Sequence, residues 1–225
     1  MAKVSIIIPC RTIDDDVVRC VHHCKQLPQD KEIIVVPDWV VPGLPATKRN
    51  WAMQQAKGDI YAFIDSDAYP HPQWLEKALH WLQTFNAVCG PGVLPTDSPE
   101  CEKIADQVHD WMFASYRVKP GTPRIVRWFP TFNLIVKKEA ATPFESFLTG
   151  EDDKFGLNIK GGIFYHPDIL VYHNRRGAFK PLWRQFATWG RHKGAFKGIA
   201  FVAFITTLCV YVVNWIKGFV TRRVK

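Results

Sequence analysis

Two aspartates one residue apart, Asp65 and Asp67, follow the apolar run at residues 60–64 within the stretch YAFIDSDAYPHPQW. The run is rich in β-branched and aromatic residues, which is typical of a strand buried on both faces of a sheet. Two carboxylates this close raise each other's pKa unless a cation or hydrogen-bond donors lie between them. The pair therefore indicates a ligand site. The alternative is that Asp65, Ser66 and Asp67 form a turn and cap the following helix.

The elements around this pair alternate. The patterns predict strands at 3–9, 31–37 and 59–65, separated by helices near 14–26 and 47–57 and followed by a helix at 72–85. This order is typical of crossover units in an α/β fold with a doubly wound, mostly parallel sheet and flanking helices. Such sheets bind ligands beyond the carboxyl ends of their strands. We therefore expect one ligand to contact Pro9-Cys10-Arg11, Asp38 and the Asp65–Asp67 turn.

Further elements follow the third strand. The sequence predicts a strand leading to a turn at 87–95, a helix near 99–115 and a strand passing into a helix at 127–140. A loop, a short helix and a final strand pair carrying His166 and His173 come next. The fold is expected to close near residue 176.

Composition narrows the class of protein. A chain of 225 residues with 47% hydrophobic and 22% charged residues indicates one sizeable domain with a tail. The net charge is +8. Many Lys and Arg residues crowd the last fifty positions among Phe, Leu and Trp, a pattern that favours an interfacial helix over a nucleic-acid site. We expect a membrane partner and no nucleic acid.

Six cysteines without a CxxC pair indicate free thiols in a reducing compartment. Cys20, His22, His23 and Cys24 lack a matching second pair, which argues against a metal site there. The N-terminal apolar run is short and leads into polar sequence. It is typical of a strand and not of a signal peptide, so we expect a cytoplasmic enzyme.

The tail contains a long uncharged stretch at 198–216. As a helix it would span about 28 Å at roughly 1.5 Å per residue, enough to cross a bilayer core. A re-entrant or in-plane helix, or a buried core helix, is the alternative. We therefore divide the chain into a catalytic domain at 1–176 and a membrane-associating segment at 177–225, with an amphipathic and then a hydrophobic helix.

With these pieces placed, residues 3 to about 195 resemble the family 2 glycosyltransferases of the GT-A fold. Each motif alone is weak, and their order and spacing make the signal specific. The matching stretches are VSIIIPCR, EIIVVPD, the segment KRNWAMQQAKGDIYAFIDSDAYPHPQWLEKAL around the DxD motif, FNLIVKKEA, GEDDKFG and VYHNRR.

The resemblance implies a nucleotide-sugar donor and a divalent cation, Mn²⁺ or Mg²⁺, that neutralises its diphosphate. It assigns Asp67 as the most direct metal ligand and Asp65 as a ligand nearer the ribose and sugar, within a donor site that includes Ser66. His173 stands where relatives place a further ligand. The alternative is an ordinary strand-end histidine.

The same resemblance places Pro9, Arg11 and Asp38 at the nucleotide. A carboxylate such as Asp38 can accept the ring N–H of the base, which favours uracil. The family has two acidic residues and Gly-Ser where this chain has Pro37–Val40. Lys48 and Arg49 are expected near the diphosphate. Their alternative is the solvated face of a helix.

The acceptor hydroxyl must lose a proton, and the resemblance assigns Asp152 as the base with Glu151 orienting it. The alternative is that the acids at 151–153 cap a helix. The motif of processive synthases is incomplete at Gln185–Trp189, which lacks its arginine. We therefore expect inverting transfer of one sugar, with a lipid-linked or other glycan as acceptor, at the cytoplasmic face of the membrane, the inner membrane in a bacterium.

Two other classes of function stay open. The first is a non-catalytic, membrane-docking binding module of the same fold, which the intact Asp65, Asp67 and Asp152 argue against. The second is a nucleotidyltransferase of similar fold, which would need a glycine-rich phosphate loop after the first strand. The stretch PCRTIDDD contains no glycine.

Overall fold

The computed structural model describes residues 3–99, 102–103, 106, 121–146 and 150–174. The chain divides into two compact units, Met1–Val93 with Val118–His173 and Leu94–Arg117 with Asn174–Lys225. All elements given below belong to the first unit. The predicted helix near 99–115 lies largely outside the described residues, and the predicted segment at 177–225 lies wholly outside them. Within the described ranges, no helix is both long enough and apolar enough to cross a membrane.

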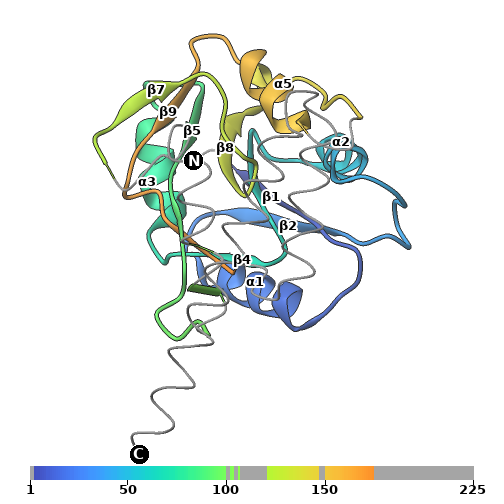
Figure 1. Cartoon of the computed structure of the whole chain (residues 1–225). Coiled ribbons are helices and arrows are strands. Elements are labelled where there is room, and N and C mark those ends of the chain that lie inside the picture. Colours follow the sequence, from blue (N-terminus) through green and yellow to red (C-terminus); the bar gives the residue numbers. More distant parts are fainter. Residues whose placement is uncertain (1–2, 100–101, 104–105, 107–120, 147–149, 175–225) are drawn as a thin grey trace, which may run out of the picture. The chain divides into compact units, whose positions relative to one another are not determined.

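A seven-stranded sheet forms the centre of the first unit (Figure 1). Its order is β2 (Lys31–Val36), β1 (Val4–Pro9), β3 (Ile60–Ile64), β8 (Asn133–Lys137), β5 (Ala87–Cys89), β9 (Ile163–Tyr165) and β7 (Arg124–Val126). Strand β1 pairs in parallel with β2 and β3, whereas β8 and β7 run antiparallel to their neighbours. The predicted mostly parallel α/β sheet is confirmed.

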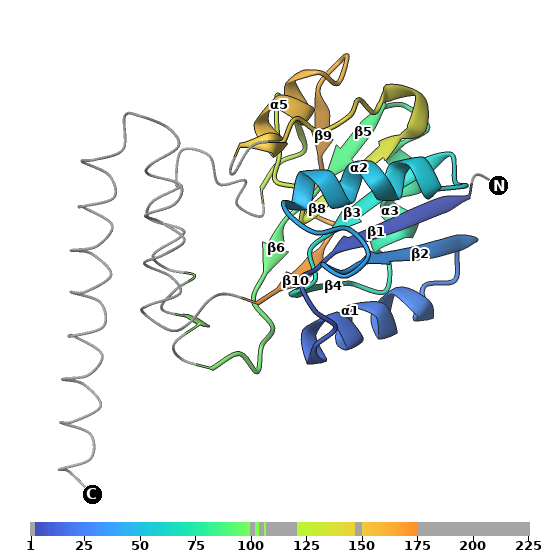
Figure 2. The same ribbon diagram turned by 90° about the vertical axis from the view of Figure 1, so that its right-hand side faces the viewer.

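Helices cover both faces of this sheet because the side chains of its central strands alternate between two apolar cores. Helix α2 (Pro45–Gln55) lies on one side of β1 and β2, and α1 (Asp15–Gln26) lies on the other (Figure 2). Ile6 and Ile8 pack in the core that includes α1 and α3 (Trp74–Trp81). Ile7 packs in the other core, with α2 and α5 (Glu151–Leu157). A 3-10 helix, η1 (Lys138–Ala140), follows β8.

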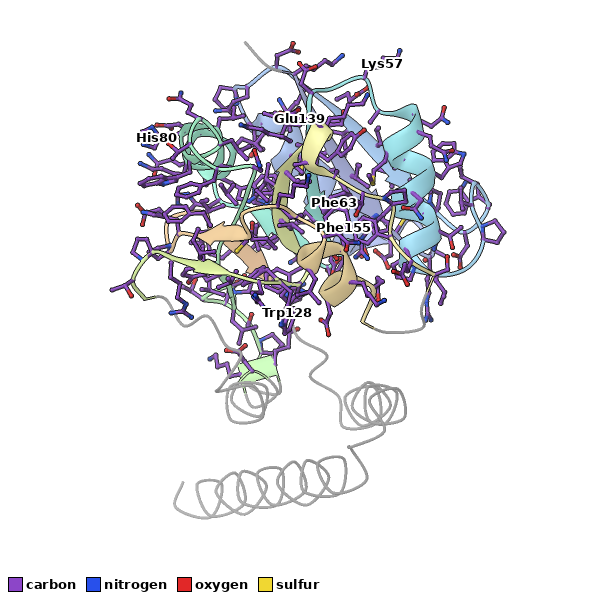
Figure 3. All side chains as sticks on the ribbon, turned by 90° about the horizontal axis from the view of Figure 1, so that it is seen from above. Lys57, Phe63, His80, Trp128, Glu139 and Phe155 are labelled. Carbon is purple, nitrogen blue, oxygen red and sulfur yellow. The ribbon has the colours of Figure 1, made fainter. Side chains whose placement is uncertain are left out.

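The second core contains an aromatic cluster that fixes α5. Phe63 of β3 and Phe155 of α5 lie side by side in Figure 3, with ring centroids 5.7 Å apart. Phe144 stacks on Phe155 at 4.0 Å. The three side chains are buried. Their packing holds the start of α5 close to the carboxyl end of β3.

A smaller sheet consists of β4 (Ala68–Pro70), β10 (Val171–His173) and β6 (Gly92–Val93). The expected final strand pair was wrong in its pairing, because β9 joins β5 in the large sheet and β10 joins β4 and β6. Gly90 lies between β5 of the large sheet and β6 of the small sheet, and a Cβ atom there would lie only 1.9 Å from the carbonyl oxygen of Ile169, which lies between β9 and β10. The two segments that pass from the large sheet to the small sheet are therefore in close backbone contact at this point.

A buried asparagine links the two sheets. Asn133, the first residue of β8, accepts a hydrogen bond from Trp74 Nε1 at 2.8 Å. Its amide nitrogen donates to the carbonyl oxygens of Ile169 at 2.7 Å and Pro91 at 3.2 Å. Because buried amide groups must be paired to avoid a large desolvation cost, this network fixes β10 relative to the large sheet.

Candidate active site

The aspartate pair lies where β3 ends, as the sequence predicts. Asp67 and His173 come together across β4 and β10, with Asp67 Oδ1 3.2 Å from His173 Nε2. Ligand atoms of Asp65, Asp67 and His173 all lie within 4.8 Å of one another. The side chain of Asp67 is 38% exposed and that of His173 is 12% exposed, so the cluster has solvent on one side. Oxygen and imidazole donors in this arrangement can hold a divalent cation.

The aspartates also form a turn, in which the Ala68 amide donates to the Asp65 carbonyl oxygen at 3.1 Å. Ser66 lies in this turn and is partly exposed. The alternative prediction of a helix cap is wrong. Helix α3 begins at Trp74, and its N-cap position is Gln73.

A buried arginine connects the aspartate pair to the acidic start of α5. Arg49 of α2 is 4% exposed. Its Nη2 donates to Asp65 Oδ1 at 3.1 Å, and its Nη1 donates to Glu151 Oε1 at 3.2 Å. The same Nη1 lies 3.6 Å from Asp152 Oδ1. Burial lowers the pKa of Arg49, but the three carboxylates more than offset this effect and raise it. The guanidinium is therefore a permanent positive charge.

Asp152 is held by a neighbouring threonine. Thr131 Oγ1 donates to Asp152 Oδ1 at 2.9 Å, and the Thr131 amide donates to Oδ2 at 3.3 Å. Gly156 makes this possible, because a Cβ there would lie 2.7 Å from Trp128 Cα and would push α5 away from the loop before β8. Burial raises the pKa of Asp152, and Asp65 adds to the increase, while Arg49 and Thr131 oppose it. Burial also raises the pKa values of Glu151 and Asp65.

The first residues after β1 and β2 form the other end of the site. The Asp38 amide donates to the Arg11 carbonyl oxygen at 3.0 Å, which joins the two loops beyond Pro9 and Val36. Lys48 Nζ forms an ion pair with Asp38 and donates to the Cys10 carbonyl oxygen at 2.6 Å. The side chain of Lys48 is 3% exposed.

The structure thus gathers the predicted residues at one edge of the sheet, in two groups. Pro9, Arg11, Asp38 and Lys48 form one, and Asp65, Ser66, Asp67, His173, Glu151 and Asp152 surround Arg49 in the other. The alternative of a solvated helix face is wrong for both Lys48 and Arg49, because both are buried. The sequence predicts Arg49 near the diphosphate and does not predict its contacts with three carboxylates. The adjacent pair Lys48-Arg49 after a proline-rich loop is the sequence feature that could have indicated a role for Arg49 in the site. Nothing in the sequence indicated the Thr131 contact.

Part of the chain matches a known protein family, and its fold is similar to that of several solved structures. Residues 43–137 match the family described as glycosyl transferase family 2. The fold is similar to that of S. aureus TarS 1-349 in complex with UDP-GlcNAc, with 17% identity and a TM-score of 0.56 over 83% of this chain and 66% of that one. A second TarS 1-349 structure gives 17% identity and a TM-score of 0.54 over 93% and 71%. The structure of A197 from STIV is 14% identical, with a TM-score of 0.50 over 79% of this chain and 87% of that one.

At these identities the structural likenesses establish the fold alone, and they confirm the predicted GT-A architecture. The chain spans just under two thirds of the first TarS structure. No curated protein matches the sequence.

Proposed function

Because residues 43–137 match the family described as glycosyl transferase family 2, we propose that this protein is a metal-dependent, inverting glycosyltransferase. It moves one sugar from a nucleotide-sugar donor to a hydroxyl group of an acceptor. The observation that carries the proposal is the placement of the Asp65, Asp67 and His173 cluster beside Asp152, with Arg49 between them. A donor site and a proton acceptor then lie at the same edge of one sheet.

The donor set of the cluster fits Mn²⁺ or Mg²⁺. Carboxylate oxygens suit both ions, and the imidazole of His173 favours Mn²⁺. Bound there, the ion supplies positive charge that stabilises the diphosphate as it leaves. Asp65 and Asp67 orient the donor from the end of β3, and the Asp67–His173 contact holds the two ligands in register across β4 and β10.

Asp152 acts as the general base. Its carboxylate removes the proton from the acceptor hydroxyl as that oxygen attacks the anomeric carbon and the bond from this carbon to the diphosphate oxygen breaks. The raised pKa of Asp152 makes it a stronger base than an exposed aspartate. Thr131 holds both carboxylate oxygens, which keeps the base in one orientation. Displacement by a single attack inverts the configuration of the sugar.

The nucleotide lies at the ends of β1 and β2. Lys48 pairs with Asp38 Oδ1, which leaves Oδ2 to accept the ring N–H of a uracil base. This contact favours a UDP-sugar as the donor. The TarS structure with UDP-GlcNAc supports the same choice for a protein of similar fold.

The acceptor is a lipid-linked glycan at the cytoplasmic face of the membrane. Support comes from the sequence of residues 177–225, which lie outside the described part of the chain, with basic and aromatic residues before an uncharged stretch. The full-length protein should float with anionic vesicles in a density gradient. Val210→Arg places a charge in the middle of that stretch, at a cost of about 2.5–3.5 kcal/mol for insertion, and should reduce flotation. A wild-type protein that stays unbound contradicts the membrane assignment.

A donor panel tests the proposed reaction. The purified protein is incubated with UDP-, GDP-, CDP- and dTDP-sugars in Mn²⁺, Mg²⁺ or EDTA, and the released nucleoside diphosphate is measured. We expect slow hydrolysis of a UDP-sugar that requires the metal ion. Binding of a UDP-sugar without any cleavage would instead indicate a binding module of the same fold.

A further inference from the structure

The acidic cluster contains more negative than positive charge. Three carboxylates, those of Asp65, Glu151 and Asp152, lie around the single guanidinium of Arg49. With all groups ionised, their formal charge is −2. Such a group cannot be explained by pairing alone, because two of the carboxylates have no equivalent positive charge in the cluster. The position of Arg49 therefore determines which carboxylate is stabilised in its ionised form.

The two ends of the guanidinium face different parts of the proposed reaction. Nη2 contacts Asp65, on the donor side, while Nη1 contacts Glu151 and lies close to Asp152, on the base side. The guanidinium also lies over the ring of Phe144, with its central carbon 5.5 Å from the ring centroid. Burial and these contacts direct the guanidinium toward the neighbouring carboxylates. Its charge acts on the neighbouring carboxylates.

The packing of Arg49 is not what stability alone would favour. Its Nε is buried and has no hydrogen-bond partner among the described residues. An unsatisfied buried donor costs stability, and so does a cluster with excess negative charge. The arrangement places Nη1 and Nη2 at two functional carboxylates at the expense of Nε.

We propose that Arg49 is a positioning residue that holds Asp152 as an ionised, fixed carboxylate and divides its charge between Asp152 and Asp65. The proposal rests on the proposed function, because it assigns Asp152 as the base. The groups facing Asp152 are Arg49 from α2, Asp65 from the end of β3, Glu151 from α5 and Thr131 from the loop before β8.

The test measures Asp152 directly, without turnover. Carboxyl ¹³C signals of labelled aspartates are followed against pH in the metal-free full-length protein, and the Asp152 signal is identified by its absence in Asp152→Asn. Loss of the guanidinium charge in Arg49→Gln should move the Asp152 midpoint to higher pH by roughly one to three units. Asp65→Asn should move it to lower pH, because a repelling and competing carboxylate is removed.

Controls separate charge from structure. Arg49→Lys keeps a positive charge that reaches one side only, so the midpoint should lie between those of wild type and Arg49→Gln. Arg19→Gln removes a charge of the same sign from an ion pair on α1 and should leave the midpoint unchanged. An unchanged midpoint in Arg49→Gln overturns the proposal. If that variant does not fold, Asp65→Asn decides, and an unchanged midpoint there overturns it equally.

The outcome is separable from that of the donor panel. A shifted midpoint in a protein that cleaves no donor supports the charge role of Arg49 and rejects the enzymatic function. Donor cleavage with unshifted midpoints leaves the enzyme and rejects the role of Arg49.

Discussion

Asp152→Asn separates catalysis from stability at a single side chain. The amide has the shape of the carboxylate and can still pair with Thr131, whose hydroxyl can donate or accept and whose amide donates. Arg49 keeps its contacts with Asp65 and Glu151. The substitution therefore removes a proton acceptor and one negative charge while the surrounding packing is preserved.

The effect on turnover follows from the role of the base. General base catalysis contributes about 10²–10⁴-fold, so transfer should fall by that factor, or about 2.7–5.4 kcal/mol in the barrier. Donor affinity should change little because Asp152 lies outside the metal cluster. A fall in turnover with constant donor affinity is the pattern of an interaction made in the transition state.

Stability should change in the opposite direction. Burial raises the pKa of Asp152 in the folded protein above its unfolded value of about 3.9. The stability that this group contributes is present below the unfolded pKa and is lost as pH rises through the folded pKa. Asparagine does not titrate, so the variant avoids that loss. It should melt at a higher temperature than wild type at neutral pH, and the difference should shrink as pH falls toward 4.

Two measurements check this prediction. Calorimetric melting from pH 4 to 8 gives the stability difference, and UDP release under saturating donor gives turnover. Wild-type turnover in the variant would refute the base assignment. A lower melting temperature at neutral pH would show that the Asp152 charge is net stabilising and would refute the account of the cluster.

Two further variants test buried hydrogen bonds that hold parts of the site in place. Lys48→Met removes hydrogen bonds from a charged donor that are worth about 1.5–3 kcal/mol each, so it should lower the unfolding free energy in urea and weaken UDP binding through Asp38. Unchanged UDP affinity in a folded variant would contradict the nucleotide assignment of Asp38. Trp74→Phe leaves Asn133 Oδ1 without its donor and should cost about 1–3 kcal/mol of stability, with turnover per folded molecule retained. A variant as stable as wild type would show that the buried bond has no net value.

Much of the fold was predictable because local patterns determine it. The runs that form β1, β2 and β3 contain β-branched residues, and the helices between them begin and end near proline and polar residues. The pairing of β9 and β10 was not predictable from such patterns. It depends on contacts between residues far apart in the sequence, such as Asn133 with Ile169 and the approach of Gly90.

The sequence predicted the candidate metal ligands better than it predicted the residues that hold the site carboxylates in place. Asp65 and Asp67 follow β3 and His173 ends β10, and the resemblance of their motifs placed them at one edge. The burial of Arg49 depends on how α2 packs against α5, because a helix with basic residues in its first turns is more often solvated. Thr131 lies in an irregular loop whose path the sequence pattern does not specify.

Donor cleavage in two matched variants of one strand tests the central claim most directly. Asp67 follows the carboxyl end of β3, and Asp59 is an exposed aspartate immediately before its amino end. With Mn²⁺ and the preferred UDP-sugar, we expect Asp67→Ala to lose metal-dependent UDP release and Asp59→Ala to keep the wild-type rate, with both variants folded. Full activity of Asp67→Ala would contradict the proposed metal and donor site.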